Sequence, residues 1–238
     1  MIFTSYYKPV VEDYDKNEKL TLTAILKILE NAGNDHSDSA GDSVIKGSNN
    51  GKAWILTDWK IEIIQRPSYG EKITTETWIE PISSPFGTSR DFLLYANDTL
   101  CVKGTTRWVL LDITTMRPTK ITEELEQNYT TEEKFVFSEK KLEKIPIPEN
   151  FSFQKEIVLR RSDIDFNNHV HNLFYLDFAL EALPDEFYKN EQFSSIRITY
   201  KNAITEGEQV VARYAKLDAK HIVCIFSHDV VKTLVELG

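Results

Sequence analysis

The chain has 238 residues, which suits one large domain or two small ones, and its hydrophobic share of 41% is enough for a packed core. Its formal net charge of −9 argues against a nucleic-acid-binding protein, because such proteins usually present a basic surface. Only two cysteines are present, and no apolar run approaches the roughly 20 residues of a membrane-spanning helix, so we expect no disulfide framework and no membrane span. Residues 1–10 lack the basic stretch and apolar run of a signal peptide, and we expect a reduced, cytoplasmic protein.

The first part of the chain predicts one helix followed by strands. Residues 2–11 are β-prone, and a polar run separates them from a helix whose apolar face begins at Leu20. Thr21 or Thr23 is the expected N-cap of this helix, and Gly33 is its expected end. Residues 34–52, rich in Gly, Ser, Asn and Asp, predict turns or a loop, with one further helical turn as an alternative. Alternating apolar residues then predict strands at 54–64, 73–79, 90–95 and 100–111.

Residues 123–150 differ in composition from the segments on either side. They are rich in Glu and Lys and end in a proline-containing stretch. We interpret them as a charged linker, partly helical and packed on the surface, because the run Phe135-Val136-Phe137 favours burial. The linker divides the chain into an N-terminal unit, residues 1–122, and a C-terminal unit, residues 151–238.

The order of predicted elements occurs twice. Asp13-x-Asp15-x-Asn17-x-Lys19 is matched 150 residues later by Asp163-x-Asp165-x-Asn167-x-His169, and each run lies between a predicted strand and an apolar helix. Further along, Trp59-x-Ile61-x-Ile63 and Gly70-Glu71 are matched 137 residues later by Ile196-x-Ile198-x-Tyr200 and Gly207-Glu208. Two matched blocks in the same order favour a duplicated unit, with a shorter loop after the second helix.

The second unit predicts how such a unit folds. Its predicted helix, residues 173–183, is apolar on nearly all sides and stops before Pro184. Strands are predicted at 151–159, 194–200, 209–217, 221–227 and 230–236. One apolar helix followed by alternating strands is not a parallel β-α-β arrangement, so the helix must be covered by the face of an antiparallel sheet. The predicted fold class is therefore α+β, with two tandem units in which an antiparallel sheet wraps a long central helix.

The run from Arg160 to Asn172 joins a strand to this helix and concentrates carboxylates, amides and imidazoles. Helix entrances have unpaired backbone N–H groups and a partial positive charge, so one of its Asp or Asn residues can serve as a helix cap. A cap requires only one such residue, and the whole cluster therefore favours a functional site at the helix entrance. In the first unit Lys19 stands at the position of His169, and there we expect only a capped helix start.

The two units look like the double hotdog fold, and the run from Arg161 to Asn172, with Tyr175-Leu176 behind it, resembles the acyl-ACP thioesterase family of plants and bacteria. The resemblance spans nearly the whole chain, and its specific part is the Asp-x-Asn-x-His run. It implies an enzyme that hydrolyses acyl-acyl carrier protein and releases free fatty acid in fatty acid biosynthesis, without a cofactor or a metal. The first unit also resembles the family at Trp54-Ile55-Leu56, Arg66-Pro67, Thr77-Trp78, Ser89-Arg90-Asp91-Phe92 and Trp108-Val109-Leu110-Leu111-Asp112.

The resemblance also implies which residues act. Carried over by position, the family's catalytic residues fall on Asp165, Asn167 and His169. The first unit is expected to line the acyl chamber. Supporting or oxyanion roles fall on Val170, His171, Asn172 and Glu181.

Two positions depart from the family pattern. His171-Asn172 stands where the family usually has Asn-Asn, and Ala203-Ile204 stands where it carries a Glu, often followed by Cys. Glu206 or Glu181 is a candidate for the role of the missing carboxylate, although Glu206 fits a solvated turn residue better. The sequence leaves open whether this departure reduces activity.

Thioester hydrolysis needs an activated water or carboxylate and a donor for the developing oxyanion. Asp165 can act as a base on water or attack directly, and the sequence does not distinguish these routes. Asn167 can orient the water or the carbonyl, His169 can donate to the thioester or share a proton with Asp165, and backbone N–H groups at residues 170–172 can polarise the carbonyl. A zinc site with Asp165, His169 and His171 is less favoured, because a turn does not place the two imidazoles on one face.

The implied partner is an acyl carrier protein, which is strongly acidic. Because the chain itself has a net charge of −9, such a carrier must dock on a local basic area. Alternatives to the acyl-ACP hydrolase are an acyl-CoA thioesterase and a non-catalytic acyl-thioester-binding protein. The acyl chain length is not determined by the sequence, nor is the oligomeric state, for which a homodimer is one possibility. The basic residues nearest the polar run are Arg160, Arg161, Arg197 and Lys201.

Overall fold

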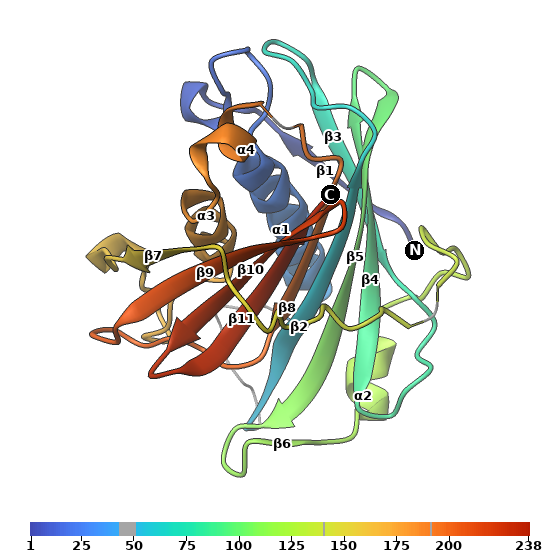
Figure 1. The fold of residues 1–238 in the computed structure, drawn as a ribbon. Coiled ribbons are helices and arrows are strands. Elements are labelled where there is room, and N and C mark those ends of the chain that lie inside the picture. Colours follow the sequence, from blue (N-terminus) through green and yellow to red (C-terminus); the bar gives the residue numbers. More distant parts are fainter. Residues whose placement is uncertain (43–50, 140, 191) are drawn as a thin grey trace. The chain divides into compact units, whose positions relative to one another are not determined.

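The computed structural model describes residues 1–42, 51–139, 141–190 and 192–238. The chain divides into two compact units, Met1–Lys140 and Lys141–Gly238 (Figure 1). The segment predicted to be a linker is thus divided between the two units. Within the described ranges, no helix combines the length and the apolar character needed to cross a membrane.

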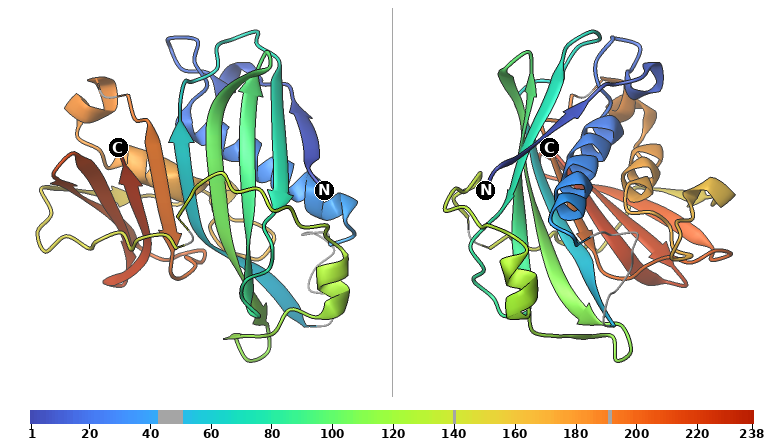
Figure 2. Two further views of the ribbon diagram at one scale, coloured as in Figure 1. Left: turned by 90° about the vertical axis from the view of Figure 1, so that its right-hand side faces the viewer. Right: turned by 180° about the vertical axis from the view of Figure 1, so that it is seen from behind.

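The first unit is an antiparallel sheet with one long helix on its face (Figure 2). The strand order is β1-β3-β4-β5-β2, with β6 paired to β5, and the helix α1 packs against β1, β3 and β4. Each of the four predicted strand runs is confirmed within a few residues. The elements are β1 (Phe3–Tyr7), η1 (Val11–Asp13), α1 (Leu22–Ser39), β2 (Lys52–Ile63), β3 (Ile73–Ile79), β4 (Gly87–Ala96), β5 (Thr99–Asp112), β6 (Arg117–Pro118) and α2 (Glu123–Gln127).

Helix α1 begins where the sequence predicts and ends later. The Thr21 hydroxyl accepts a hydrogen bond from the Ala24 N–H at 3.0 Å, which makes Thr21 the N-cap. The prediction that Gly33 ends the helix is wrong, because α1 continues to Ser39. A Cβ on Gly33 would lie 3.4 Å from the Cδ of Arg90, so this glycine marks a close approach to β4. Residues 34–39 of the segment predicted as turns or a loop are helical, which agrees with the alternative of one further helical turn, and residues 43–50 lie outside the described part of the chain.

Part of the predicted linker crosses the first unit as a strap. The Trp78 Nε1–H donates to the Lys134 carbonyl at 2.8 Å, and the Val136 N–H donates to the Asp91 carboxylate at 2.8 Å. The expected burial of the aromatic run is wrong for Phe135, which is 54% exposed, because backbone contacts hold the strap. Asp91 itself is completely buried beneath it.

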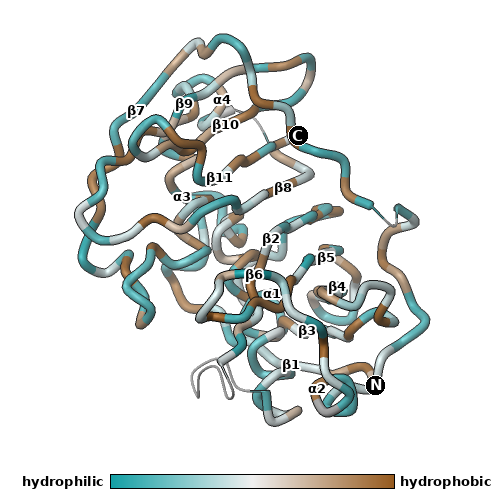
Figure 3. Tube along the Cα trace, turned by 90° about the horizontal axis from the view of Figure 1, so that it is seen from below, coloured by the Kyte–Doolittle hydropathy of each residue, from teal (hydrophilic) through white to brown (hydrophobic). Residues whose placement is uncertain are grey.

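The second unit repeats the architecture of the first. Its strand order is β7-β9-β10-β11-β8. Position by position, these strands correspond to β1-β3-β4-β5-β2 of the first unit. Hydrophilic and hydrophobic residues occur in both units (Figure 3). Every second residue is buried along the end of β2 and in β8, as a sheet with one buried face requires, whereas β10 is buried from His221 to Ser227. The predicted duplication is confirmed at the level of topology. The elements are β7 (Phe153–Ile157), η2 (Arg161–Asp163), α3 (Phe174–Glu181), α4 (Asp185–Asn190), β8 (Ser195–Tyr200), β9 (Val210–Leu217), β10 (Lys220–Ser227) and β11 (Val230–Leu237).

Helix α3 is the central helix of the second unit and packs against β10 and β11. It spans residues 174–181 and is shorter than the predicted 173–183. Leu176 and Ala179 are 0% exposed, so the helix contributes its apolar face to the core. The entrance of α3, directly after the polar run, is where the candidate site lies.

We expect Asp91 to make the stability of the first unit depend on pH. Burial, together with the neighbouring Glu80 carboxylate, raises the pKa of Asp91 to about 7, whereas an aspartate in an unfolded chain titrates near 4. The folded state therefore binds this proton more tightly, and the free energy of unfolding falls as pH rises from about 4 to about 7. Asp91→Asn should remove this loss and stabilise the protein at pH 8 on the order of 2–3 kcal/mol, with little change at pH 4.

Urea unfolding at the two pH values measures this difference. Asp98→Asn, in an exposed turn, is the matched control and should change the free energy of unfolding at neither pH. A wild-type protein as stable at pH 8 as Asp91→Asn would contradict the buried-acid account.

Candidate functional site

The polar run of the second unit folds into a tight turn before α3. The Asp165 N–H donates to the His169 carbonyl at 2.7 Å, and the Asn168 N–H donates to the Asp165 carbonyl at 3.1 Å. Asn168 has a φ of 61°, in the left-handed region that asparagine tolerates better than most residues. The chain then returns antiparallel to itself, with Val170 paired to Ile164. The Asp-x-Asn-Asn-His sequence thus closes into one turn.

The Asp165 carboxylate builds this turn with only one of its oxygens. Its Oδ1 accepts the backbone N–H groups of Asn167 and His169 at 2.7 and 3.1 Å. Asp165 is half-buried, while Asn167 and His169 are exposed. Among the residues that the structure describes, no group pairs with the Oδ2 of Asp165. The turn therefore brings the three predicted catalytic residues together and presents one carboxylate oxygen for chemistry.

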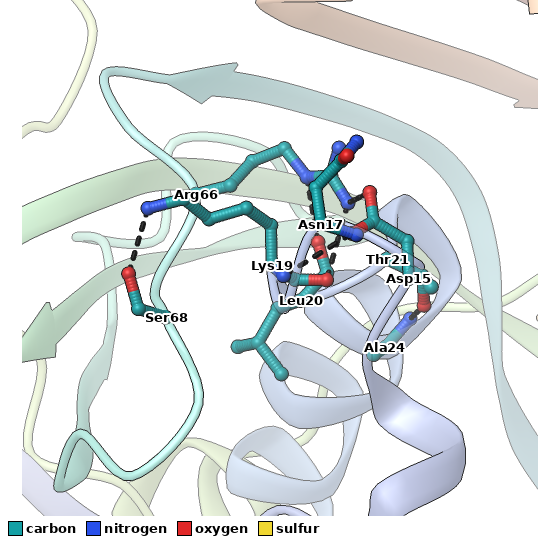
Figure 4. A network of polar contacts seen from close by, with 8 residues as sticks. All are labelled: Asp15, Asn17, Lys19, Leu20, Thr21, Ala24, Arg66 and Ser68. Carbon is teal, nitrogen blue, oxygen red and sulfur yellow. Dashed lines mark hydrogen bonds and ion pairs between the residues drawn. The ribbon is translucent and has the colours of Figure 1, made fainter. Parts of the chain in front are cut away.

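The first unit contains the same turn, shown in Figure 4. The Asp15 Oδ1 accepts the N–H groups of Asn17 and Lys19 at 2.8 and 3.2 Å, and the Asp15 N–H donates to the Lys19 carbonyl at 2.8 Å. Glu18 has a φ of 59°, matching Asn168 of the second unit. Because the backbone geometry is the same, side chains that differ between the two turns show what has diverged.

In the first unit an arginine closes the turn. The Arg66 guanidinium donates to the Asp15 Oδ2 at 2.7 Å and to the Leu20 carbonyl at 2.6 Å (Figure 4). Burial would raise the pKa of Asp15, but the hydrogen bonds from its turn and from Arg66 lower it instead. Lys19 is also engaged, because its Nζ donates to the Ser68 hydroxyl at 2.7 Å. Both oxygens of Asp15 are thus occupied.

The second unit has Ala203 at the position of Arg66. The match follows from neighbouring contacts: the Leu20 N–H donates to the Pro67 carbonyl at 2.9 Å, and the Val170 N–H donates to the Ile204 carbonyl at 2.8 Å. Ala203 also stands where the family carries its Glu. This departure therefore leaves the Asp165 carboxylate without the arginine that neutralises its counterpart.

Asp163 anchors the turn from within the core. It is 0% exposed, and its carboxylate accepts the Arg160 N–H and the Arg160 Nε–H, each at 2.8 Å. Its carbonyl accepts the His171 N–H at 2.9 Å. The first acid of the motif is therefore structural, and the second acid carries the unoccupied oxygen.

The structure narrows the set of backbone donors expected at the helix entrance. The N–H groups of Val170 and His171 are already bonded, to the carbonyls of Ile204 and Asp163. The Asn172 N–H contacts no acceptor within the described ranges. Of the three predicted oxyanion donors, Asn172 is the one whose backbone N–H is available.

His171 supports the helix entrance. Its Nδ1 accepts the Leu173 N–H at 3.3 Å, and burial lowers the pKa of the imidazole, although the nearby Asp165 opposes this. This contact uses one of the ring nitrogens that a zinc site would need. In the described part of the chain, no group of three or more His, Cys, Asp or Glu side chains is placed to hold a metal ion.

Neither glutamate considered for the missing carboxylate contacts the turn among the described residues, and a third one holds the segment that pairs with the turn. Glu181 is the last residue of α3 and pairs with Lys155 on β7, and Glu206 is exposed. Glu208, which sequence reasoning left without a role, accepts the Thr205 N–H and hydroxyl, both at 2.9 Å. The sequence feature that could have pointed to Glu208 is the Gly-Glu pair, which occurs in both units as Gly70-Glu71 and Gly207-Glu208.

Glu208 braces the segment that the turn pairs with. Thr205 forms a bridge with His169, and Lys232 contacts the Glu208 Oε2 at 3.0 Å. Burial would raise the pKa of Glu208, but hydrogen bonds from Ser227, Thr205 and Lys232 lower it to about 2. Glu208 is therefore a charged support beneath the site.

Family models match both units. The model described as "Acyl-ACP thioesterase N-terminal domain" matches residues 1–129, and "Acyl-ACP thioesterase C-terminal domain" matches residues 148–234.

Among curated proteins, the oleoyl-acyl carrier protein thioesterase 1 of Arabidopsis thaliana, a chloroplastic protein, is 29% identical over 222 residues, which cover 85% of this chain and 61% of that protein. The chloroplastic oleoyl-acyl carrier protein thioesterase of Coriandrum sativum is 26% identical over 212 residues, which cover 82% of this chain and 57% of that protein. The chain thus spans about three fifths of the length of these relatives.

Two solved structures are similar over nearly the whole chain. The 12:0-ACP thioesterase from Umbellularia californica has a TM-score of 0.89 at 17% identity, and the acyl-ACP thioesterase from Bacteroides thetaiotaomicron has 0.88 at 20%. Each match covers 99% of this chain and 96% of the other. The predicted double hotdog fold is confirmed by these matches.

The two acids of the motif should differ in their effect on stability. Asp163→Ala removes a buried carboxylate that accepts two hydrogen bonds from Arg160 and pairs with its guanidinium, and it should lower the free energy of unfolding by about 2–3 kcal/mol. Asp165→Ala removes two turn hydrogen bonds at a partly exposed site and should cost about 1 kcal/mol, as loss of a helix cap does. Urea unfolding of both variants measures the two values. A larger loss for Asp165→Ala would reverse the assignment of anchor and reacting acid.

Proposed function

The chain belongs to the acyl-ACP thioesterase family, and from this premise we propose that it hydrolyses acyl-acyl carrier protein to free fatty acid and carrier. The observation that carries the proposal is the difference between the two turns. In the first unit the aspartate is closed by Arg66, whereas in the second the Oδ2 of Asp165 has no partner in the described part of the chain. We therefore place the reaction at the second turn.

The reacting oxygen is the Oδ2 of Asp165, because Oδ1 is held by two backbone N–H groups. As a base, this oxygen takes a proton from water while the water oxygen attacks the thioester carbon. As a nucleophile, it attacks the carbon itself and forms an anhydride that water then cleaves. In both routes the carrier leaves as a thiolate and takes up a proton.

The remaining residues of the turn supply donors. The exposed His169 imidazole lies on the same turn and can deliver the proton to the leaving thiolate. The Asn172 N–H, at the entrance of α3, is the donor for the developing oxyanion, because charge that forms near a helix N-terminus is stabilised. Asn167 orients the water or the carbonyl.

Two exposed cations beside the site suit an acidic carrier. Arg160 is engaged with Asp163, and Arg197 donates to the Glu143 carbonyl. Arg161 and Lys201 are exposed, and no group within the described ranges pairs with either side chain. We assign these two residues to the docking of the carrier protein, whose acidic surface they attract.

A non-catalytic acyl-thioester-binding protein is the second candidate function, because Ala203 replaces the family's Glu. We expect Asp165→Ala to lower kcat for acyl-ACP hydrolysis on the order of 1,000-fold, and His169→Ala on the order of 100-fold. Free-thiol release from acyl-ACP of several chain lengths measures this, beside matched acyl-CoA substrates. Asp15→Ala, in the first unit, is the matched control and should leave kcat unchanged. Equal background rates for wild type and Asp165→Ala would favour the binding protein.

The first unit suggests a variant that closes the active turn. Ala203→Arg places a guanidinium where Arg66 binds Asp15, so it should pair with the Asp165 Oδ2 and lower kcat about 100-fold or more. The unfolding temperature should not fall, since an ion pair is gained. Asn202→Arg adds the same charge at the neighbouring exposed position and should retain most of the activity. If both variants lose activity equally, general charge rather than pairing with Asp165 is responsible.

A further inference from the structure

The first turn of α3 carries a tyrosine whose hydroxyl group contacts the segment on the other side of the site. Tyr175 is 2% exposed, and its hydroxyl oxygen accepts the Ile204 N–H at 3.0 Å. The Ile204 carbonyl in turn accepts the Val170 N–H at 2.8 Å, and the next residue, Thr205, forms a bridge with His169. The tyrosine thus connects α3 to the strand-like segment that aligns the catalytic turn.

The first unit has no such hydroxyl and needs none. Ile25 lies 150 residues before Tyr175 and is 0% exposed, and Pro67 lies 137 residues before Ile204. Proline has no N–H group, so nothing at this position requires an acceptor. The remaining contact is the same in both units, because the Leu20 N–H donates to the Pro67 carbonyl at 2.9 Å. The second unit therefore has both the Ile204 N–H donor and the Tyr175 hydroxyl acceptor, and the first unit has neither group at the matching positions.

Other groups fix the same segment from the sheet side. The Lys232 Nζ donates to the Ala203 carbonyl at 3.2 Å, and Glu208 accepts both the N–H and the hydroxyl of Thr205. Ile204 between them is 0% exposed, so its N–H would be costly to leave without a partner. The Tyr175 hydroxyl is the contact that ties this braced segment to the helix of the active turn.

We propose that Tyr175 is a positioning residue of the hydrolytic site: by accepting the Ile204 N–H, it fixes the segment against which Val170 and His169 align. The inference rests on the proposed hydrolysis, because it assigns to Tyr175 the alignment of a turn that carries the reacting Asp165. Tyr175 acts through this segment and does not itself touch the substrate.

The contact itself is independent of pH in the range where enzymes work. Burial raises the pKa of Tyr175 to about 12, although the Ile204 N–H opposes this shift, so the hydroxyl stays neutral. Loss of the hydroxyl should therefore lower kcat at every pH without changing the shape of the pH profile. A residue that gives or takes a proton would change that shape instead.

The test removes donor and acceptor together, because the first unit carries an apolar residue and a proline, Ile25 and Pro67, at these two positions. We expect Tyr175→Phe to lower kcat about tenfold or more for acyl-ACP hydrolysis, with KM within about twofold, because the Ile204 N–H loses its acceptor. Tyr175→Phe combined with Ile204→Pro removes acceptor and donor together, as in the first unit, and should recover kcat to within about threefold of wild type. Tyr214→Phe removes another buried hydroxyl hydrogen bond, to His221, and is the control that should leave kcat unchanged.

Two results would overturn the assignment. Tyr175→Phe with kcat within twofold of wild type would show that the contact does not position the site. A loss of kcat that a folded double variant does not recover would show that the hydroxyl acts on the reacting groups directly.

Amide hydrogen exchange gives a readout that needs neither activity nor the double variant. In Tyr175→Phe the Val170 N–H should exchange at least tenfold faster, while the Leu20 N–H, which makes the same contact in the first unit, should exchange as in wild type. Equal changes at both amides, or none at Val170, would refute the positioning role. A chain that shows the expected exchange but hydrolyses no thioester would refute the proposed function alone.

Discussion

In front of the central helix of each unit, α1 and α3, one aspartate accepts the backbone N–H groups of a tight turn. Asp15 does so in the first unit and Asp165 in the second, with nearly the same distances. This contact sets the path of the chain from the edge strand into the central helix. Because Oδ1 accepts the turn N–H groups, only Oδ2 of each aspartate can make further contacts. The proposed chemistry depends on whether a cation pairs with this Oδ2, as Arg66 does in the first unit.

Three positions separate a closed turn from an open one on this common backbone. Lys19 becomes His169, which exchanges a side-chain ammonium group for an imidazole. Arg66 becomes Ala203, which removes an ion pair, and Pro67 becomes Ile204, which adds a buried N–H. The fold tolerates these changes because none alters the backbone hydrogen bonds of the turn.

The sequence predicted most of the fold because strands and helices leave periodic patterns. The strands of both units lie within a few residues of their predicted positions, and the matched blocks predicted the duplication. Gly33 misled the prediction, because a glycine that permits a close approach to Arg90 looks in sequence like a helix end. The strap over Asp91 was predicted only as a linker packed on the surface, because its hydrogen bonds with Trp78 and Asp91 use backbone groups that any residue carries.

The candidate site was predictable in its local part only. Asp165, Asn167 and His169 stand close together in sequence, and a tight turn keeps them together in space. The segment around Ile204 follows β8, more than 30 residues further along the chain. No local sequence pattern predicts its contact with Val170. The occupied N–H groups of Val170 and His171 could not be read from sequence for the same reason.

The presence of both units in one polypeptide has a consequence for how such a site can evolve. In an assembly of two identical chains, every substitution appears in both copies, so a residue that improves one turn must be tolerated in the other. Covalent fusion removes this constraint. One copy can then hold its acid in an ion pair, as the Asp15 turn does with Arg66, while the other copy carries an alanine at the position of that arginine.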